Sequence, residues 1–159
     1  MDAYRELAVD AGDIKLAGGE GCHSFHQAKN MIDYAKLHYV QIDAGRVGGI
    51  TAAKQAADYA HLRGVQFVNH TFTSHLALSA SIQPFVGYSS NYLCEYPFDP
   101  SPLTAVSYCR ELEPGRDGNV RLPEVPGLGV TPDMAKMGAY LKEVEIRLGG
   151  QLLFKSSTL

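Results

Sequence analysis

Short apolar runs alternate along the first hundred residues with longer stretches in which apolar side chains recur at helical spacing. The apolar runs, which predict β-strands, cover residues 14–17, 39–43, 65–70 and 92–95. The stretches between them, which predict helices, cover residues 24–37, 51–63 and 76–82. Because strands that alternate with helices are typical of parallel βαβ units, the pattern predicts an α/β fold with four parallel strands.

Residues that favour helix ends support this assignment. Ser24 is a candidate N-cap of the first helix, with Gln27 three residues later as its partner in a capping box. Thr51 and Ser74 are candidate N-caps of the second and third helices, and Gly64 is a candidate stop for the second. The caps therefore agree with the boundaries that the apolar pattern predicts.

The composition changes after residue 97. Proline and glycine are frequent in residues 97–130, which predicts an irregular arm. One more helix is expected after Thr131, its candidate N-cap, and the weak alternation of residues 144–154 is compatible with an edge strand. We therefore divide the chain into a strand–helix part, residues 1–97, and a C-terminal arm, residues 98–159.

Composition and charge narrow the classes of protein and partner. The 159 residues are 45% hydrophobic and carry a formal net charge of −3, which is too mild and mixed to favour a nucleic acid or a membrane surface as partner. No run of 18 apolar residues predicts a membrane span, and the first residues do not resemble a signal peptide. Three cysteines without a CxxC motif (Cys22, Cys94 and Cys109) argue against a disulfide framework and favour a reducing cytoplasm.

An ionisable residue lies at or just after the C-terminal end of each predicted strand. Glu20, Asp43, His70 and Glu95 are separated by 23, 27 and 25 residues, which is about one strand–helix unit each time. The carboxyl ends of parallel strands form one face, and ligands bind at that face in α/β architectures. A single residue of this kind is more often a helix cap or a loop residue, but four in phase indicate a shared site.

The residue types at these positions point to proton-transfer chemistry. Glu20 is a hard oxygen donor of the kind that Mg²⁺ prefers. Asp43 could hydrogen-bond His70, which would fix the imidazole tautomer and let the pair take or deliver a proton near neutral pH. Glu95, if it lies in an apolar pocket, would stay protonated and donate a hydrogen bond to a developing oxyanion.

Three other residues, His23, Arg46 and His75, are candidates for substrate contact. His23 also forms an HxxH pair with His26, but this pair would need two more donors to hold zinc. We favour the interpretation that His23 lies in a loop above the strand ends and touches substrate. Arg46 would pair with an acid or approach a substrate anion, and a solvated loop position is the alternative. His75 is expected beside the pocket, at the start of the third helix.

Four motifs occur along the chain in a fixed order. They are Leu16-Ala17-Gly18-Gly19-Glu20, the segment Gln41-Ile42-Asp43 with the glycine-rich turn after it, Val68-Asn69-His70, and Cys94-Glu95-Tyr96-Pro97. The ordered set resembles the mandelate racemase-like branch of the enolase superfamily. The segment Pro126-Gly127-Leu128-Gly129-Val130 is similar to the C-terminal arm of that branch.

This resemblance implies a role for each strand-end residue. Glu20 is similar to the third of three carboxylates that bind Mg²⁺ in the family. Asp43 and His70 are similar to its Asp–His acid/base pair, and Glu95 to the acid that hydrogen-bonds the substrate carboxylate. The family reaction, as the resemblance implies it, removes the proton α to a carboxylate, and Mg²⁺ stabilises the enediolate that forms.

The resemblance also implies the C-terminal half of a TIM-type (β/α) barrel followed by an irregular arm. A complete barrel takes about 250 residues, and we expect two metal ligands, a Lys-x-Lys pair and a capping domain to be missing from this chain. We expect the C-terminal portion of a Mg²⁺-dependent acid-sugar dehydratase that is inactive alone, since polar residues such as Asn69, Thr71 and Thr73 suit a polyhydroxylated substrate.

Two alternatives stay open. The first is a racemase or epimerase of the same superfamily. The second is a non-catalytic half-barrel from a truncated gene, which would associate with itself because open sheet edges and apolar helix faces favour pairing. A homo-oligomer is expected in either case.

Overall fold

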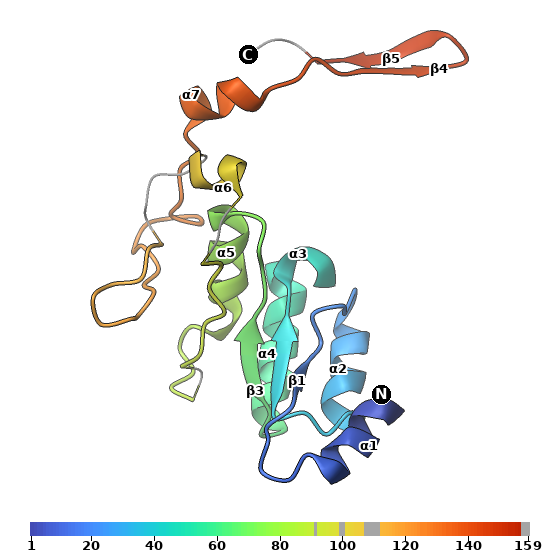
Figure 1. Ribbon diagram of the computed structural model, residues 1–159, viewed down its shortest axis with the longest axis vertical. Helices are drawn as coiled ribbons and strands as arrows, with labels where there is room; N and C mark the ends of the chain where they lie inside the picture. The colour runs from blue at the N-terminus through green and yellow to red at the C-terminus, as the bar shows by residue number, and fades with distance from the viewer. Residues whose placement is uncertain (91, 99–100, 107–111, 157–159) are drawn as a thin grey trace.

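Three parallel strands form the sheet that carries the strand-end residues in this computed structural model, which describes residues 1–90, 92–98, 101–106 and 112–156. The strands are β1 (Ala17–Gly18), β2 (Tyr39–Ile42) and β3 (Gln66–Asn69). They lie in sequence order, and Ile42 at the end of β2 is opposite Asn69 at the end of β3. The α/β class predicted from the alternation is therefore found in this part of the chain (Figure 1).

Two of the predicted helix caps are confirmed. α2 (Phe25–Tyr34) begins after Ser24, whose Oγ accepts a hydrogen bond from the backbone N–H of Gln27. α5 (His75–Ile82) begins after Ser74, which caps its first turn in the same way. Both caps fix the direction in which the chain leaves the sheet.

The predicted cap of the second helix is wrong. α4 (Ile50–Leu62) includes Thr51 and begins after Gly49, which has a φ of +105°. Glycine adopts this conformation without the steric cost that a Cβ would bring, so backbone geometry sets this boundary. Gly64, with a φ of +70°, follows the end of α4 as expected. The other elements of this part are α1 (Asp2–Asp10), α3 (Ala44–Val47) and the 3₁₀ turn η1 (Gln83–Phe85).

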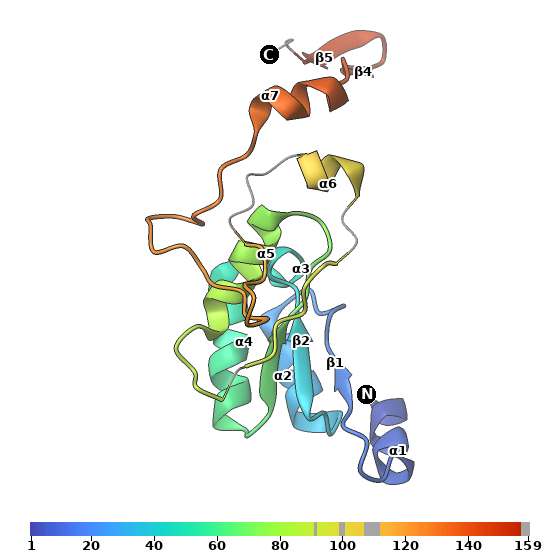
Figure 2. The same cartoon turned by 60° about the vertical axis from the view of Figure 1, so that its left-hand side comes forward.

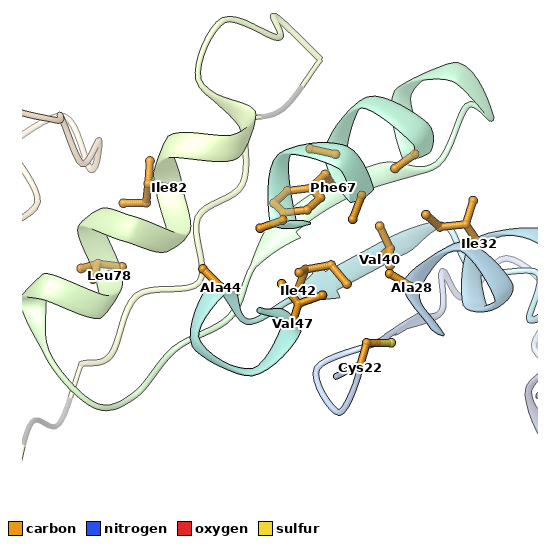
Figure 3. Packing of buried hydrophobic residues seen from close by; sticks show 14 of the residues in the cluster. Cys22, Ala28, Ile32, Val40, Ile42, Ala44, Val47, Phe67, Leu78 and Ile82 are labelled. Carbon is orange, nitrogen blue, oxygen red and sulfur yellow. The ribbon is translucent and has the colours of Figure 1, made fainter. Parts of the chain in front are cut away.

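The core lies between the sheet and the helices that cover one of its faces (Figure 3). Val40, Ile42 and Phe67 are buried on that face. The alanines of α4 that are fully buried against it are Ala53, Ala56, Ala57 and Ala60. Because these side chains are small, the α4 backbone can approach the strands closely. Alternation along β3 then directs His70 to the opposite face.

The first predicted strand is shorter than its apolar run. Ile14 is 70% exposed and precedes β1, and only Ala17 and Gly18 pair with β2. Tyr4 of α1 packs against this strand, since a Cβ on Gly18 would lie 2.7 Å from the Tyr4 hydroxyl. A larger residue at position 18 would displace the Tyr4 side chain and not the backbone.

The fourth predicted strand is wrong. Residues 92–98 are described and do not form a strand. Side chains of β3 hold this segment instead, because Gln66 Nε2 donates to the Ser90 carbonyl at 2.9 Å and Asn69 pairs with the backbone of Glu95. An apolar run shows that a segment is suited to a pleated, half-buried surface, but it does not supply the ladder partner that a strand needs.

The C-terminal arm differs from its prediction in two places. Its elements are α6 (Pro102–Val106), α7 (Met134–Met137), the 3₁₀ turn η2 (Gly138–Tyr140), β4 (Glu145–Leu148) and β5 (Gln151–Lys155). Asp133, and not Thr131, caps α7 by accepting from the backbone N–H of Lys136 at 3.0 Å. The expected edge strand is a two-stranded antiparallel hairpin that turns at Gly149 and Gly150, both with positive φ.

The arm is joined to the first part by packing and by hydrogen bonds. Leu112 is fully buried in the common core cluster, and Val120, Leu122 and Val130 pack against that cluster. Ser79 of α5 donates from Oγ to the Leu128 carbonyl at 2.6 Å. The hairpin and α7 lie apart from the sheet in both views (Figures 1 and 2). Within the described ranges, no helix has both the length and the apolar character needed to cross a membrane. The division at residue 97 stays a prediction.

Candidate active site

His70 and Asp43 are in contact at the carboxyl ends of β3 and β2. His70 Nδ1 lies 3.1 Å from Asp43 Oδ2. The backbone N–H of His70 donates to the Ile42 carbonyl at 3.0 Å, which extends the parallel pairing by one residue and fixes the position of the imidazole. His70 is only 4% exposed. The structure thus brings together the two residues expected to form an acid/base pair, and their catalytic role stays a prediction.

Asp43 has a separate contact for each carboxylate oxygen. Its Oδ1 accepts hydrogen bonds from the backbone N–H groups of Gly45 at 2.8 Å and Arg46 at 3.1 Å, and so caps α3. Its Oδ2 is left to contact His70. Because β2 ends at Ile42 and α3 begins at Ala44, the cap holds the carboxylate beside the imidazole, and Arg46 Nε lies 3.9 Å from the same Oδ2.

A second carboxylate contacts the other side of the imidazole. Glu20 Oε2 lies 2.7 Å from His70 Nε2, although 56% of the Glu20 side chain is exposed. Gly19 makes this approach possible, since it has a φ of +117° and a Cβ there would lie 2.9 Å from the Gln41 carbonyl. Each nitrogen of the imidazole therefore faces a carboxylate oxygen, Nδ1 that of Asp43 and Nε2 that of Glu20. A carboxylate accepts hydrogen bonds, so this arrangement suits an imidazole that exchanges a proton at Nε2.

Glu95 lies near this pair on the segment that replaces the fourth strand. Burial is the largest cause of a raised pKa for its carboxyl group; His70 opposes the rise, and the negative charge of Glu20 adds to it. Its Oε2 is buried without a hydrogen-bond partner among the described residues. Glu95 therefore has a raised pKa and keeps its proton to higher pH than an ordinary glutamate.

The three candidate substrate residues have different positions. Arg46 lies at the site, because its NH1 donates to the Glu20 carbonyl at 3.3 Å and its Nε is 3.9 Å from Asp43 Oδ2. His23 is exposed just before α2, and its backbone N–H donates to Gln27 Oε1 at 2.6 Å. His75 is partly buried at the first residue of α5. A contact of any of these residues with substrate stays a prediction.

Sequence reasoning missed two neighbours of His70. Phe72 packs edge-to-face against the imidazole with ring centroids 5.2 Å apart, and 59% of it is exposed. The loop that holds it is anchored by Thr104 of α6, which donates to the Thr73 carbonyl at 2.9 Å. The side chain of Asn69, the residue before His70, contacts Ser81 on α5 and the backbone of Glu95, a pairing that the sequence did not reveal. The sequence feature that could have identified Asn69 is an amide side chain within an otherwise apolar strand. No sequence feature identifies Phe72.

The described residues do not complete a magnesium site. Glu20 offers the oxygen chemistry that Mg²⁺ prefers, but its Oε2 is engaged by His70. Within the described ranges, no group of three or more His, Cys, Asp or Glu side chains is placed to hold a metal ion.

Comparison with known proteins gives consistent matches over most of the chain. The sequence profile described as "Enolase C-terminal domain-like" matches residues 1–136. A predicted mandelate racemase from Rhodobacter sphaeroides, known as a crystal structure, is 45% identical, with a TM-score of 0.89 over 98% of this chain and 40% of its own.

Two curated relatives have names that state an activity. A D-xylonate dehydratase of Haloferax volcanii is 23% identical over 89% of this chain and 34% of its own length. A D-galactarolactone cycloisomerase of Agrobacterium fabrum is 27% identical over 82% of this chain and 36% of its own length. The chain thus spans about a third of the length of the curated relatives it matches.

Proposed function

Because the chain belongs to the enolase C-terminal domain-like family, we propose that it supplies the His–Asp side of an enzyme that dehydrates an acid sugar. The observation that carries this proposal is the 3.1 Å contact of Asp43 Oδ2 with His70 Nδ1 at the ends of two parallel strands. The relative named for dehydration of D-xylonate supports the reaction class. In this proposal residues 1–97 form the second half of a (β/α) barrel, and residues 98–159 form the arm.

The proposed reaction begins with removal of the proton on the carbon next to the substrate carboxylate. His70 Nε2 is the atom that takes or delivers a proton, while Asp43 holds the ring through Nδ1. As the hydroxyl on the next carbon leaves, it takes a proton and departs as water, and the enol that remains becomes a 2-keto-3-deoxy acid. Glu95, which keeps its proton, would donate a hydrogen bond to the carboxylate as negative charge builds on it.

The contact of Glu20 with His70 sets a condition on this chemistry. A substrate can reach Nε2 only when the Glu20 carboxylate moves away from it. The side chain is more than half exposed, so rotation about its own bonds is enough. In the proposal Glu20 then serves as one oxygen ligand of Mg²⁺, and the other ligands come from outside the described residues of this chain. Mg²⁺, when bound, would stabilise charge on the substrate carboxylate.

The substrate contacts proposed for Arg46, His23 and His75 differ in support. The Arg46 guanidinium already lies beside Asp43 and the Glu20 backbone, where a substrate anion would arrive. His23 and His75 are proposed only from their positions after the first and third strands. The cytoplasm as compartment and a homo-oligomer as assembly are proposed as well, the latter because the apolar side chains of the β4–β5 hairpin are exposed.

The test is a chimaera in which this chain replaces the matched 40% of the Rhodobacter sphaeroides protein, which the identity of 45% and the shared fold make feasible. The chimaera and the chain alone are incubated with a panel of aldonic acids and Mg²⁺ in D₂O. NMR measures exchange of the α-proton, and a semicarbazide assay measures 2-keto-3-deoxy acid. We expect both signals in the chimaera, and neither in the chain alone.

Two substitutions separate the proposed chemistry from general damage. His70→Asn should lower exchange by about 100-fold or more, the size expected when a general acid/base is lost. His61→Asn, which changes an exposed histidine on α4, should leave it unchanged. Exchange without a keto product would contradict dehydration and favour a racemase, an epimerase or a cycloisomerase. A chimaera that folds like its parent by near-UV circular dichroism and exchanges no acid would overturn the proposal.

A further inference from the structure

Asn69 is fully buried, and its side-chain amide is paired with the backbone of Glu95, 26 residues later in the sequence. Asn69 Nδ2 donates to the Glu95 carbonyl at 3.0 Å, and the Glu95 N–H donates to Asn69 Oδ1 at 3.0 Å. The same Nδ2 lies 3.3 Å from Ser81 Oγ on α5. The amide therefore uses both of its donor hydrogens and its acceptor.

This pairing takes the place of a strand ladder at the open side of β3. Residues 92–98 are not a strand, so no regular set of inter-strand hydrogen bonds fixes the position of Glu95 along the direction of β3. A primary amide that both donates to and accepts from one residue reproduces what a neighbouring peptide would do. Gln66, at the other end of β3, donates to the carbonyl of Ser90, which lies just before this segment, at 2.9 Å.

We propose that Asn69 is a positioning residue that fixes the Glu95 carboxyl group relative to the His70 imidazole. Asn69 and His70 are adjacent, so their Cα atoms are about 3.8 Å apart across one planar peptide. Glu95 is attached to this peptide unit by two reciprocal hydrogen bonds. His70, the proposed proton-transfer group, and Glu95, the proposed carboxylate-binding group, are thus both held by the same stretch of backbone at the end of β3. The chemical meaning of this inference rests on the proposed function.

The surroundings of Glu95 explain why the pairing with Asn69 matters for the position of its carboxyl group. Its carboxyl group is partly buried, and its Oε2 has no hydrogen bond among the described residues to hold it. The backbone pairing with Asn69 holds Glu95 itself, while the flanking Cys94 and Tyr96 pack against the core. Without Asn69 the segment can move outward, water reaches the carboxyl group, and the geometry that acid catalysis needs is lost.

The first measurement uses the chain itself and needs no activity. Scalar coupling across the hydrogen bond between Asn69 Nδ2 and the Glu95 carbonyl carbon, measured by NMR on labelled protein, should be present. The Glu95 amide should also exchange with D₂O at least 10-fold more slowly than the same amide in Asn69→Ala. Absence of the coupling in the wild-type chain would overturn the proposal, whatever the folding of any variant.

The second measurement follows the Glu95 carboxyl carbon through a pH titration. In Asn69→Ala its pKa should fall towards the ordinary glutamate value of about 4.3, because water reaches the group. Ser81→Ala is the matched control, since it removes the third contact of the same amide and leaves the Glu95 peptide paired. Equal shifts in the two variants would mean that Asn69 only supports the core, and would overturn the proposal.

The third measurement uses the chimaera described above. Asn69→Ala should lower kcat/KM at least 10-fold and move the limb of the pH–rate profile that belongs to Glu95, while Ser81→Ala should leave that limb in place. An unmoved limb in Asn69→Ala would count against positioning. If the wild-type chimaera exchanges no acid, the proposed function has failed, and the two NMR measurements still decide the role of Asn69.

Discussion

Glu20 occupies the imidazole nitrogen of His70 that a substrate would need, with 2.7 Å between Glu20 Oε2 and His70 Nε2. The opposite nitrogen is held by Asp43 at 3.1 Å. The two contacts differ in permanence, because the Asp43 side chain is 14% exposed and the Glu20 side chain 56%. We therefore regard Asp43 as the fixed partner of the imidazole and Glu20 as the exchangeable one.

Glu20→Ala should hardly change the stability of the chain. Ion pairs with an exposed partner contribute about 0–1 kcal/mol, so the free energy of unfolding in urea should change by less than about 1 kcal/mol. The ¹⁵N resonance of His70 Nε2 should move and that of Nδ1 should not. Glu6→Ala, on the exposed face of α1, is the control and should move neither resonance.

Replacing Asp43 should separate its two contacts. Asp43→Asn keeps an oxygen that can cap α3, so stability is retained, but the carboxylate that holds His70 Nδ1 is lost and α-proton exchange in the chimaera should fall by about 100-fold. Asp43→Ala loses the cap as well and should cost about 1 kcal/mol more in urea unfolding. Equal stabilities of the two variants would contradict the capping role assigned to Oδ1.

Glu95→Gln should alter how stability depends on pH. Burial raises the pKa of Glu95 in the folded chain, so the unfolded chain loses its proton first as pH rises. The wild-type chain should therefore lose stability between the ordinary glutamate pKa and the raised one, and Glu95→Gln should not. Urea unfolding at intervals from pH 4 to pH 8 checks this; the two chains should be most alike at the acidic end.

The β4–β5 hairpin should mediate self-association. Its exposed apolar side chains include Ile146, Leu152 and Phe154, and exposed apolar surface of this kind favours burial against a second molecule. Phe154→Glu should weaken dimerisation at least 10-fold in sedimentation equilibrium. Leu62→Glu places the same charge on an exposed residue of α4 and should leave it unchanged. A wild-type chain that is monomeric at all concentrations would refute this assembly.

Local chemistry explains which features of the fold could be predicted. Ser24 and Ser74 cap helices through side-chain contacts with residues three positions away, so the pattern needed is contained in a few neighbouring residues. Gly49 sets the start of α4 through its backbone conformation, which no side-chain pattern reveals, and the prediction of Thr51 as N-cap is wrong for that reason.

Long-range pairing explains what the sequence did not reveal. The run at residues 92–95 is apolar enough for a strand, yet it is held by the amide of Asn69, which lies 26 residues earlier. The closeness of His70 and Asp43 was expected, because in-phase strand ends meet at one edge. The contact of Glu20 with the far side of the ring was not, since it depends on a turn at Gly19 that lets the chain pass close to Gln41.

The helix-capping contact of Asp43 affects which substitutions at this position would be tolerated in proteins that evolve from this chain. Its Oδ1 would be retained by helix stability alone, through Gly45 and Arg46, even in a lineage that had given up chemistry. An acid or amide retained at position 43 would therefore indicate that the helix cap is maintained, and would not by itself indicate catalysis. His70 caps no helix, so loss of the imidazole at position 70 would be the earlier sign that activity has been lost.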